Sequence, residues 1–189
     1  MDRAEKPPGQ LQTRYKANKM NASFERAKTI YKAARLYSRA SFVLDQQAVK
    51  SEMERYLVLP SLVNAALSLE LYFKSLYLLE YSRDFKVKNK HSHDFHLLYG
   101  ELSKSIKQEI ETEYNRNIKD ADLTGIKQLE LITGSPIKLD LPSILKNWSG
   151  VFVRIRYFFD KNDNRLSMIF FPEIEKALVH IIKRQNPDW

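Results

Sequence analysis

Apolar residues recur every three or four positions along most of the chain, and this spacing predicts a mostly helical protein. The first such pattern begins at Asn21 or Ser23, either of which can cap a helix, and continues to about Gln47. Its apolar positions are Phe24, Ala27, Tyr31, Ala34 and Tyr37. Its opposite face is basic and carries Arg26, Lys28, Lys32, Arg35 and Arg39. Residues 1–20 contain Pro7-Pro8-Gly9 among polar residues, so we predict a disordered basic tail there.

A second helix is predicted to have Pro60 in its first turn, where a missing N–H costs nothing, and to end near Tyr81. It is apolar nearly all round, which is typical of a central helix covered on most sides. Its most apolar stretch, residues 57–79, still contains Asn64, Glu70 and Lys74, so we predict a core helix and no membrane span. The first residues are polar and do not resemble a signal peptide, and we expect a cytoplasmic protein.

Later segments repeat the helical spacing. Further helices are predicted over residues 92–114, 118–132 and 141–159, and from Pro172 toward the end of the chain. Gly134-Ser135-Pro136 predicts a turn, and residues 168–171 form a short apolar run that could be extended. About five principal helices of these lengths favour an all-α antiparallel bundle. We therefore expect a single helical domain over residues 21–189.

The composition excludes several kinds of functional site and shows an uneven distribution of charge. The absence of cysteine excludes disulfides, thiolate metal sites and cysteine nucleophiles, and no glycine-rich phosphate loop or nucleophile elbow occurs. The net charge of +8 is concentrated at one end, because residues 1–50 hold 11 Lys/Arg against 4 Asp/Glu. This asymmetry indicates either an arm for nucleic acid or an acidic partner, or only a solvated helix face and tail.

The histidine-rich segment around residue 93 is the one cluster that suggests a metal. His93 and His96 share a helix face, whereas Asp94 points about 100° away from His93. This geometry favours a capped helix start over a ligand set, with Asp94 complementing the helix dipole. We predict no metal and no cofactor.

Glu70 is an acidic residue within an apolar helix, and a buried carboxylate needs a partner. Lys74 lies one turn away and can pair with it. Arg156 is a second candidate partner, because it lies one turn beyond Phe152 at the edge of an apolar face. Arg154 is about 160° away from Arg156 and is expected to be solvated. We predict a structural Glu70–Arg156 pair, with a catalytic pair as the alternative.

Three segments carry a family resemblance: residues 68–74 in the central helix, residues 93–98 at a helix start, and residues 156–159 in a late aromatic helix. In this order they resemble the HEPN superfamily of helical domains from prokaryotic defence and toxin–antitoxin systems, over residues 55–185. The resemblance implies a compact bundle, commonly a two-fold dimer, that often handles RNA. Active members are metal-independent ribonucleases with a histidine four to six positions after an arginine. No arginine here has a histidine at that spacing, so the ribonuclease activity is not carried over.

These observations predict a non-catalytic, HEPN-like homodimer that engages RNA, a nucleotide or a protein partner of the antitoxin type. The 10 Tyr, 10 Phe and 2 Trp exceed what a small core needs, which also favours a dimer. A divergent ribonuclease using Arg156, Asp160 and His93 is one alternative, and a structural subunit is another. The candidate binding residues are Arg154, Arg156, Asp160, His93, Asp94, Lys86 and Lys88.

Overall fold

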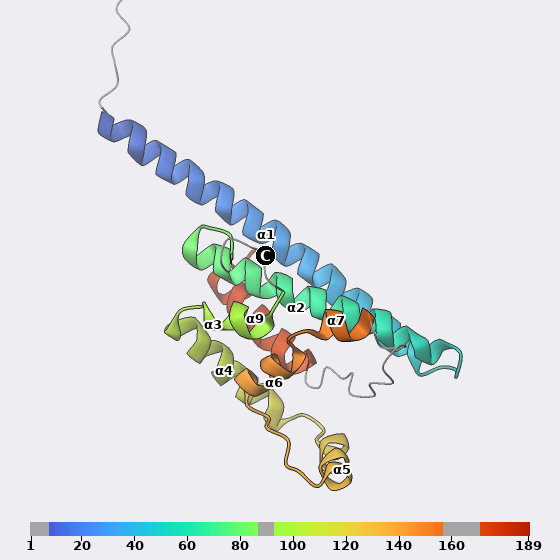
Figure 1. Cartoon of the computed structure of the whole chain (residues 1–189). Helices are drawn as coiled ribbons and strands as arrows, with labels where there is room; N and C mark the ends of the chain where they lie inside the picture. Colours follow the sequence, from blue (N-terminus) through green and yellow to red (C-terminus); the bar gives the residue numbers. More distant parts are fainter. Residues whose placement is uncertain (1–7, 87–92, 157–170) are drawn as a thin grey trace, which may run out of the picture.

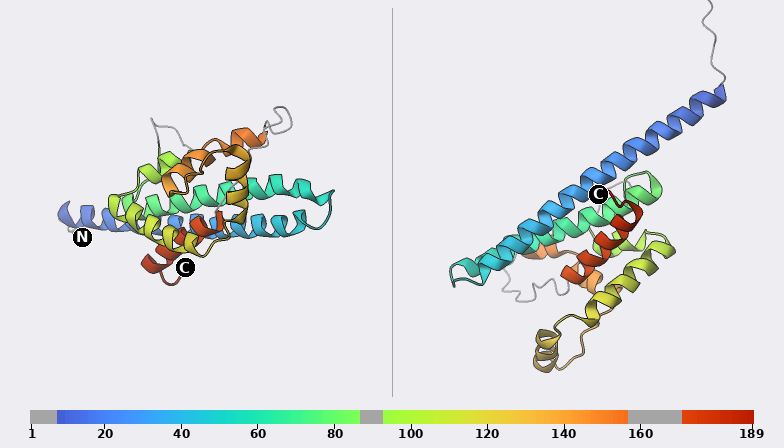
Figure 2. Two further views of the ribbon diagram at one scale, coloured as in Figure 1. Left: turned by 90° about the horizontal axis from the view of Figure 1, so that it is seen from below. Right: turned by 180° about the vertical axis from the view of Figure 1, so that it is seen from behind.

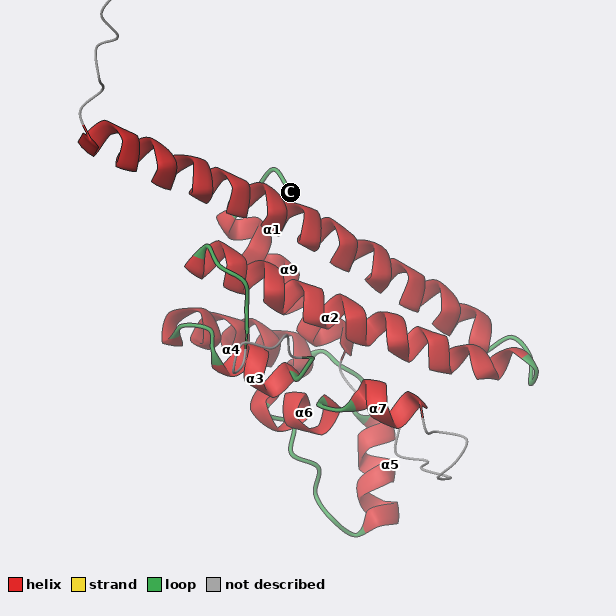
Figure 3. Ribbon diagram, turned by 45° about the horizontal axis from the view of Figure 1, so that its top comes forward, coloured by secondary structure: helices red, strands yellow, loops and turns green. Residues whose placement is uncertain are grey.

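The structure is a computed structural model that describes residues 8–86, 93–156 and 171–189. In chain order its helices are α1 (Pro8–Ala48), η1 (Glu54–Leu57), α2 (Val58–Tyr81), α3 (Phe95–Gly100), α4 (Lys104–Lys119), α5 (Thr124–Thr133), α6 (Leu141–Trp148), α7 (Val151–Arg156) and α9 (Phe171–Gln185) (Figure 1). Figure 3 shows these elements by type, and the described ranges contain no strand. The all-α prediction is confirmed.

Helices α1 and α2 form a long hairpin, in which they lie side by side and run in opposite directions (Figures 1 and 2). Small side chains line the contact, since Ala27 and Ala34 of α1 are fully buried. The hydroxyl of Ser75 donates to the carbonyl of Ala27 at 2.9 Å, and Ser41 and Ser61 share a hydrogen bond of 3.0 Å. These small residues allow the two backbones to approach closely.

Helix α1 begins at Pro8, well before the predicted start at Asn21. The predicted disordered tail is therefore wrong for residues 8–20, and residues 1–7 lie outside the described part. Proline is tolerated in a first turn, and no strong breaker follows Gly9, so the helix can begin this early. Figure 1 shows this first part of α1 projecting beyond the end of its partner α2.

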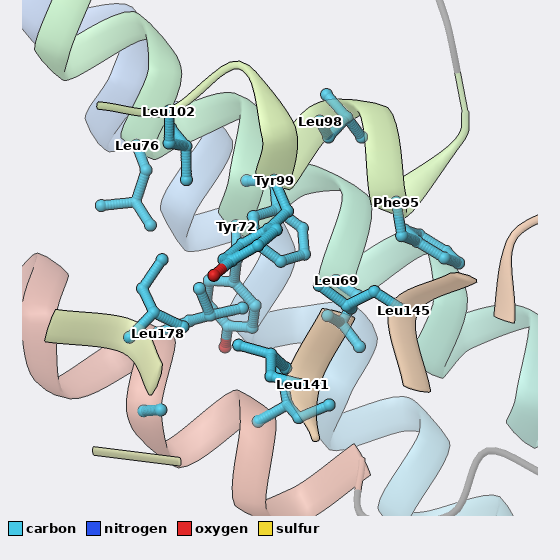
Figure 4. Packing of buried hydrophobic residues seen from close by; sticks show 14 of the residues in the cluster. Leu69, Tyr72, Leu76, Phe95, Leu98, Tyr99, Leu102, Leu141, Leu145 and Leu178 are labelled. Carbon is cyan, nitrogen blue, oxygen red and sulfur yellow. The ribbon is translucent and has the colours of Figure 1, made fainter. Parts of the chain in front are cut away.

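Helix α2 is the central helix, as its all-round apolar sequence predicted. Leu69, Tyr72, Phe73 and Leu76 are buried in one cluster with side chains of α3, α6 and α9 (Figure 4). By length and composition alone, residues 54–81 could cross a membrane. Half of that apolar window is buried inside the protein, and Leu69, Tyr72 and Phe73 of α2 are fully buried.

Two predicted helices are each interrupted once. The segment predicted as a helix over 92–114 ends at Gly100 and restarts as α4, whose N-cap Ser103 accepts from the N–H of Ile106. The segment 141–159 breaks at Gly150, which has a φ of 81° that favours glycine. The predicted cap Ser92 lies outside the described residues, and Asp94 caps α3 by accepting from the N–H of Leu97 at 3.0 Å.

The remaining signals lie close to their predicted places. The turn at Gly134 is confirmed, with a φ of 64° at the end of α5. Helix α5 itself covers 124–133 and not 118–132, because α4 continues to Lys119. Helix α9 begins at Phe171, and the rest of the predicted extended run over 168–171 lies outside the described residues.

Candidate functional site

Glu70 lies on the central helix α2 and is buried, with 5% of its side chain exposed. Both carboxylate oxygens have partners. The ammonium of Lys74 lies 2.5 Å from Oε1, and Nδ1 of His93 lies 2.8 Å from Oε2. The predicted one-turn pair with Lys74 is confirmed. We name Glu70, Lys74 and His93 the Glu70 cluster.

The predicted partner Arg156 is the last residue of α7, and its side chain lies outside the described part of the structure. The Glu70–Arg156 pair therefore stays a prediction. The sequence did not predict His93 as a partner of Glu70. The segment before α3 brings it onto α2, and no local sequence signal marks a contact across that distance along the chain.

The Glu70 cluster opens to solvent at His93, whose side chain is 67% exposed. The ring of His93 meets Phe152 of α7 edge-on, with ring centroids 5.9 Å apart. Asp94 accepts a hydrogen bond from the hydroxyl of Ser149 at 2.8 Å, which ties the start of α3 to the junction of α6 and α7. His93 and Asp94 are thus held at one place, where α2, α3 and α7 meet.

The other residues predicted for this site lie elsewhere or outside the description. The guanidinium of Arg154, which was predicted to be solvated, is half-exposed: it donates to the carbonyl of Asn147, while its Nε is buried. Lys86 is exposed at the end of its described segment. Lys88 and Asp160 lie outside the described residues. Within the described ranges, no group of three or more His, Asp and Glu residues is arranged to hold a metal ion.

A second candidate site lies on the outer face of α1. Lys28, Lys32, Arg35 and Arg39 follow one another at intervals of four, three and four residues. At about 100° per residue they fall within roughly 60° of the helix circumference, over about 16 Å of its length. We name these four residues the basic stripe. The predicted basic helix face is confirmed for them, but it is wrong for Arg26, which at 100° per residue lies about 160° from Lys28.

Most of the basic stripe is free of counter-charges. Among the described residues, Lys28, Lys32 and Arg39 form no ion pair, whereas Arg35 lies 3.6 Å from Glu175. Arg26 differs, because it is paired with Asp84 at 2.9 Å and belongs to another face. Three uncompensated cations in one line give this face of α1 a positive potential.

A groove of about 400 Å³ lies beside the basic stripe, where the end of the chain returns to α1 (Figure 1). Its lining combines aromatic and cationic side chains: Tyr31, Lys32, Arg35, Leu36, Lys183 and Trp189. The rings of Tyr31 and Trp189 are tilted against each other with centroids 5.7 Å apart. Phe24 supports Trp189 edge-on at 5.1 Å. The groove is therefore an aromatic surface edged by three cations.

Polar groups beneath the groove are tightly arranged. The hydroxyl of Tyr72 donates to Oε1 of Glu175 at 2.9 Å, the same oxygen that Arg35 approaches. Burial, followed by the charge of Glu175, raises the pKa of Tyr72, and burial also raises the pKa of Tyr31. The hydroxyl of Tyr31 is buried and has no hydrogen-bond partner among the described residues.

Sequence reasoning found the basic stripe through its helical spacing, but it did not find the groove. Trp189 and Lys183 reach Tyr31 only through the packing of the last helix, which leaves no local signal. A comparison of the chain with protein families, curated proteins and solved structures gives no match. The function is therefore argued from the two sites themselves.

Proposed function

We propose that this protein is a HEPN-like, non-catalytic helical protein that binds RNA through the basic stripe of α1. The observation that carries the proposal is the line of four cations on one helix face, of which Lys28, Lys32 and Arg39 lack an ion pair within the described part of the chain. Cations without protein partners are available to phosphates, and replacing condensed counterions is the main source of non-specific nucleic-acid affinity.

The dimensions of the basic stripe suit a nucleic-acid backbone. One strand of a duplex carries a phosphate for about every 3.4 Å of axis, so a stripe of about 16 Å faces about five phosphates. Such contacts fix the position of a strand without reading its sequence. The proposal is therefore one of low sequence specificity and strong salt dependence.

The test compares two triple variants that remove the same charge. Lys28→Gln/Lys32→Gln/Arg39→Gln removes the three cations of the basic stripe that are unpaired among the described residues. It keeps Arg35, which is paired with Glu175. Lys104→Gln/Lys119→Gln/Lys127→Gln removes three exposed lysines from α4 and α5. Fluorescence anisotropy with a labelled RNA should show a loss of at least tenfold for the first variant and a small loss for the second. Equal losses would mean that only net charge matters.

A ribonuclease is the second candidate, and the Glu70 cluster is the observation in its favour. A buried carboxylate that orients an exposed imidazole is an arrangement used in general acid–base catalysis. Purified protein incubated with RNA, with and without a chelator, should bind without cleaving. Cleavage that is lost in His93→Ala would establish the ribonuclease instead.

We further propose that the protein is a cytoplasmic homodimer. Large apolar side chains are exposed toward the closed end of the α1–α2 hairpin: Phe42, Val43, Val49, Met53, Tyr56 and Val58. Large exposed apolar side chains concentrated in one region mark an interaction site more often than a free monomer surface does. The resemblance to a superfamily whose members are commonly two-fold dimers supports a second copy as the partner, and a protein partner of the antitoxin type is the alternative.

A further inference from the structure

The groove beside the basic stripe has the two features that an unpaired nucleobase requires. The half-buried indole of Trp189, which packs on the buried ring of Tyr31, offers a flat face for stacking. The groove's volume of about 400 Å³ lies in the range of small-ligand sites, which are commonly about 300–1,000 Å³. An apolar face alone would suit many ligands, so the charges around it decide the occupant.

Those charges are positive and continuous with the basic stripe. Lys32 and Arg35 belong to both the stripe and the groove, and Lys183 adds a cation from α9. Glu175 is the nearby counter-charge, and it is already held by Tyr72 and Arg35. An occupant with a negative backbone and a flat ring therefore satisfies both parts of the groove.

We infer that the groove receives an unpaired base of single-stranded nucleic acid, stacked on Trp189, while the flanking phosphates follow the basic stripe. This inference rests on the proposed RNA binding and specifies the ligand as single-stranded nucleic acid. Bases of a duplex are already stacked and paired, and they cannot enter such a groove. Tyr31 lies beneath Trp189, and because its side chain is buried it supports the indole rather than contacting the base.

The two tryptophans permit a direct measurement of stacking. Trp148 is buried at 3% exposure in α6, whereas Trp189 lines the groove. In a Trp148→Phe variant, the fluorescence of Trp189 alone reports on the groove. Three probes are titrated: a single-stranded RNA, the same sequence as a duplex, and a single-stranded abasic oligonucleotide of equal length. The single strand should quench Trp189, and the duplex and abasic probes should bind without quenching it.

A second measurement does not depend on Trp148→Phe folding. In the otherwise native chain, Trp189→Ala should weaken single-stranded RNA binding about fivefold to a hundredfold, which is the usual effect of losing one base–aromatic stack. Its salt dependence should not change, because no phosphate contact is lost. Trp189→Phe should restore most of the affinity, since a smaller aromatic ring can still stack.

Failure of this inference can be distinguished from failure of RNA binding. Unchanged affinity in Trp189→Ala, or equal quenching by the abasic probe, would overturn the groove inference and leave the basic stripe standing. RNA binding that is unaffected by Lys28→Gln/Lys32→Gln/Arg39→Gln would overturn the proposed function as well. Equal affinity for the single strand and the duplex would also contradict a base in the groove.

Discussion

Replacing Lys74 by methionine should destabilise the protein, because Glu70 would lose one of its two partners while staying buried. The Glu70 side chain is 5% exposed and that of Lys74 is 21% exposed, so their 2.5 Å contact is weakly screened by water. Methionine keeps the apolar stem of lysine in place and removes only the charge. The change therefore isolates the ion pair from the packing around it.

The expected cost follows from what remains around Glu70. Removing one partner of a buried pair usually costs about 3–5 kcal/mol when the other charge is left alone. Here His93 still lies 2.8 Å from Oε2 of Glu70, so we expect a smaller cost of about 2 kcal/mol. For a chain of this length, that corresponds to a fall of roughly 4–8 °C in Tm.

The assay is a double-mutant cycle measured by denaturant unfolding. Glu70→Gln keeps the shape of the side chain and removes its charge, so the double variant Lys74→Met/Glu70→Gln should recover about 1–2 kcal/mol relative to additivity. Arg55→Met is the control, because Arg55 and Glu52 form an exposed pair that should contribute less than about 1 kcal/mol. A coupling near zero between positions 70 and 74 would refute the reasoning.

Two further predictions concern the N-cap of α6 and the hairpin end. Asp140→Ala should cost about 1 kcal/mol at neutral pH, because the carboxylate of Asp140 accepts from the N–H of Ser143 at 2.9 Å. That hydrogen bond lowers the pKa of Asp140, so the stabilisation is complete above the ordinary pKa and is lost as the pH falls through the lowered pKa. Unfolding curves of the variant and the wild type should therefore differ at neutral pH and coincide at strongly acidic pH. Sedimentation should show a dimer of the 22.2 kDa chain that Phe42→Lys/Val49→Lys weakens at least tenfold, and a wild-type monomer at tens of micromolar would contradict the dimer.

The elements that sequence predicted well have strong local causes. Pro60 in a first turn and an apolar surface all round place α2, and glycine with a positive φ ends α5 at Gly134. The basic stripe was found in the same way, because helical spacing alone puts its members on one face. Each of these features is determined by residues that are close together in the sequence.

The features that sequence did not predict depend on packing between distant segments. His93 reaches Glu70, and Trp189 reaches Tyr31, only after the helices have assembled. The breaks at Gly100 and Gly150 let short helices follow the surface of α2, although a continuous helical spacing runs through both. The early start of α1 was hidden because Pro7-Pro8-Gly9 resembles a loop, while Pro8 is compatible with a first helical turn.

The salt dependence of RNA binding tests the central claim most directly. For single strands, log K falls with log salt by about 0.7 for each phosphate contact, so the three members of the basic stripe that have no ion pair in the described part of the chain predict a slope near −2.1. Lys28→Gln/Lys32→Gln/Arg39→Gln removes these three contacts and keeps Arg35, which is paired with Glu175, so the slope should fall to near zero. The Lys104→Gln/Lys119→Gln/Lys127→Gln control should keep the wild-type slope. A stripe variant that retains the wild-type slope would contradict RNA binding through α1.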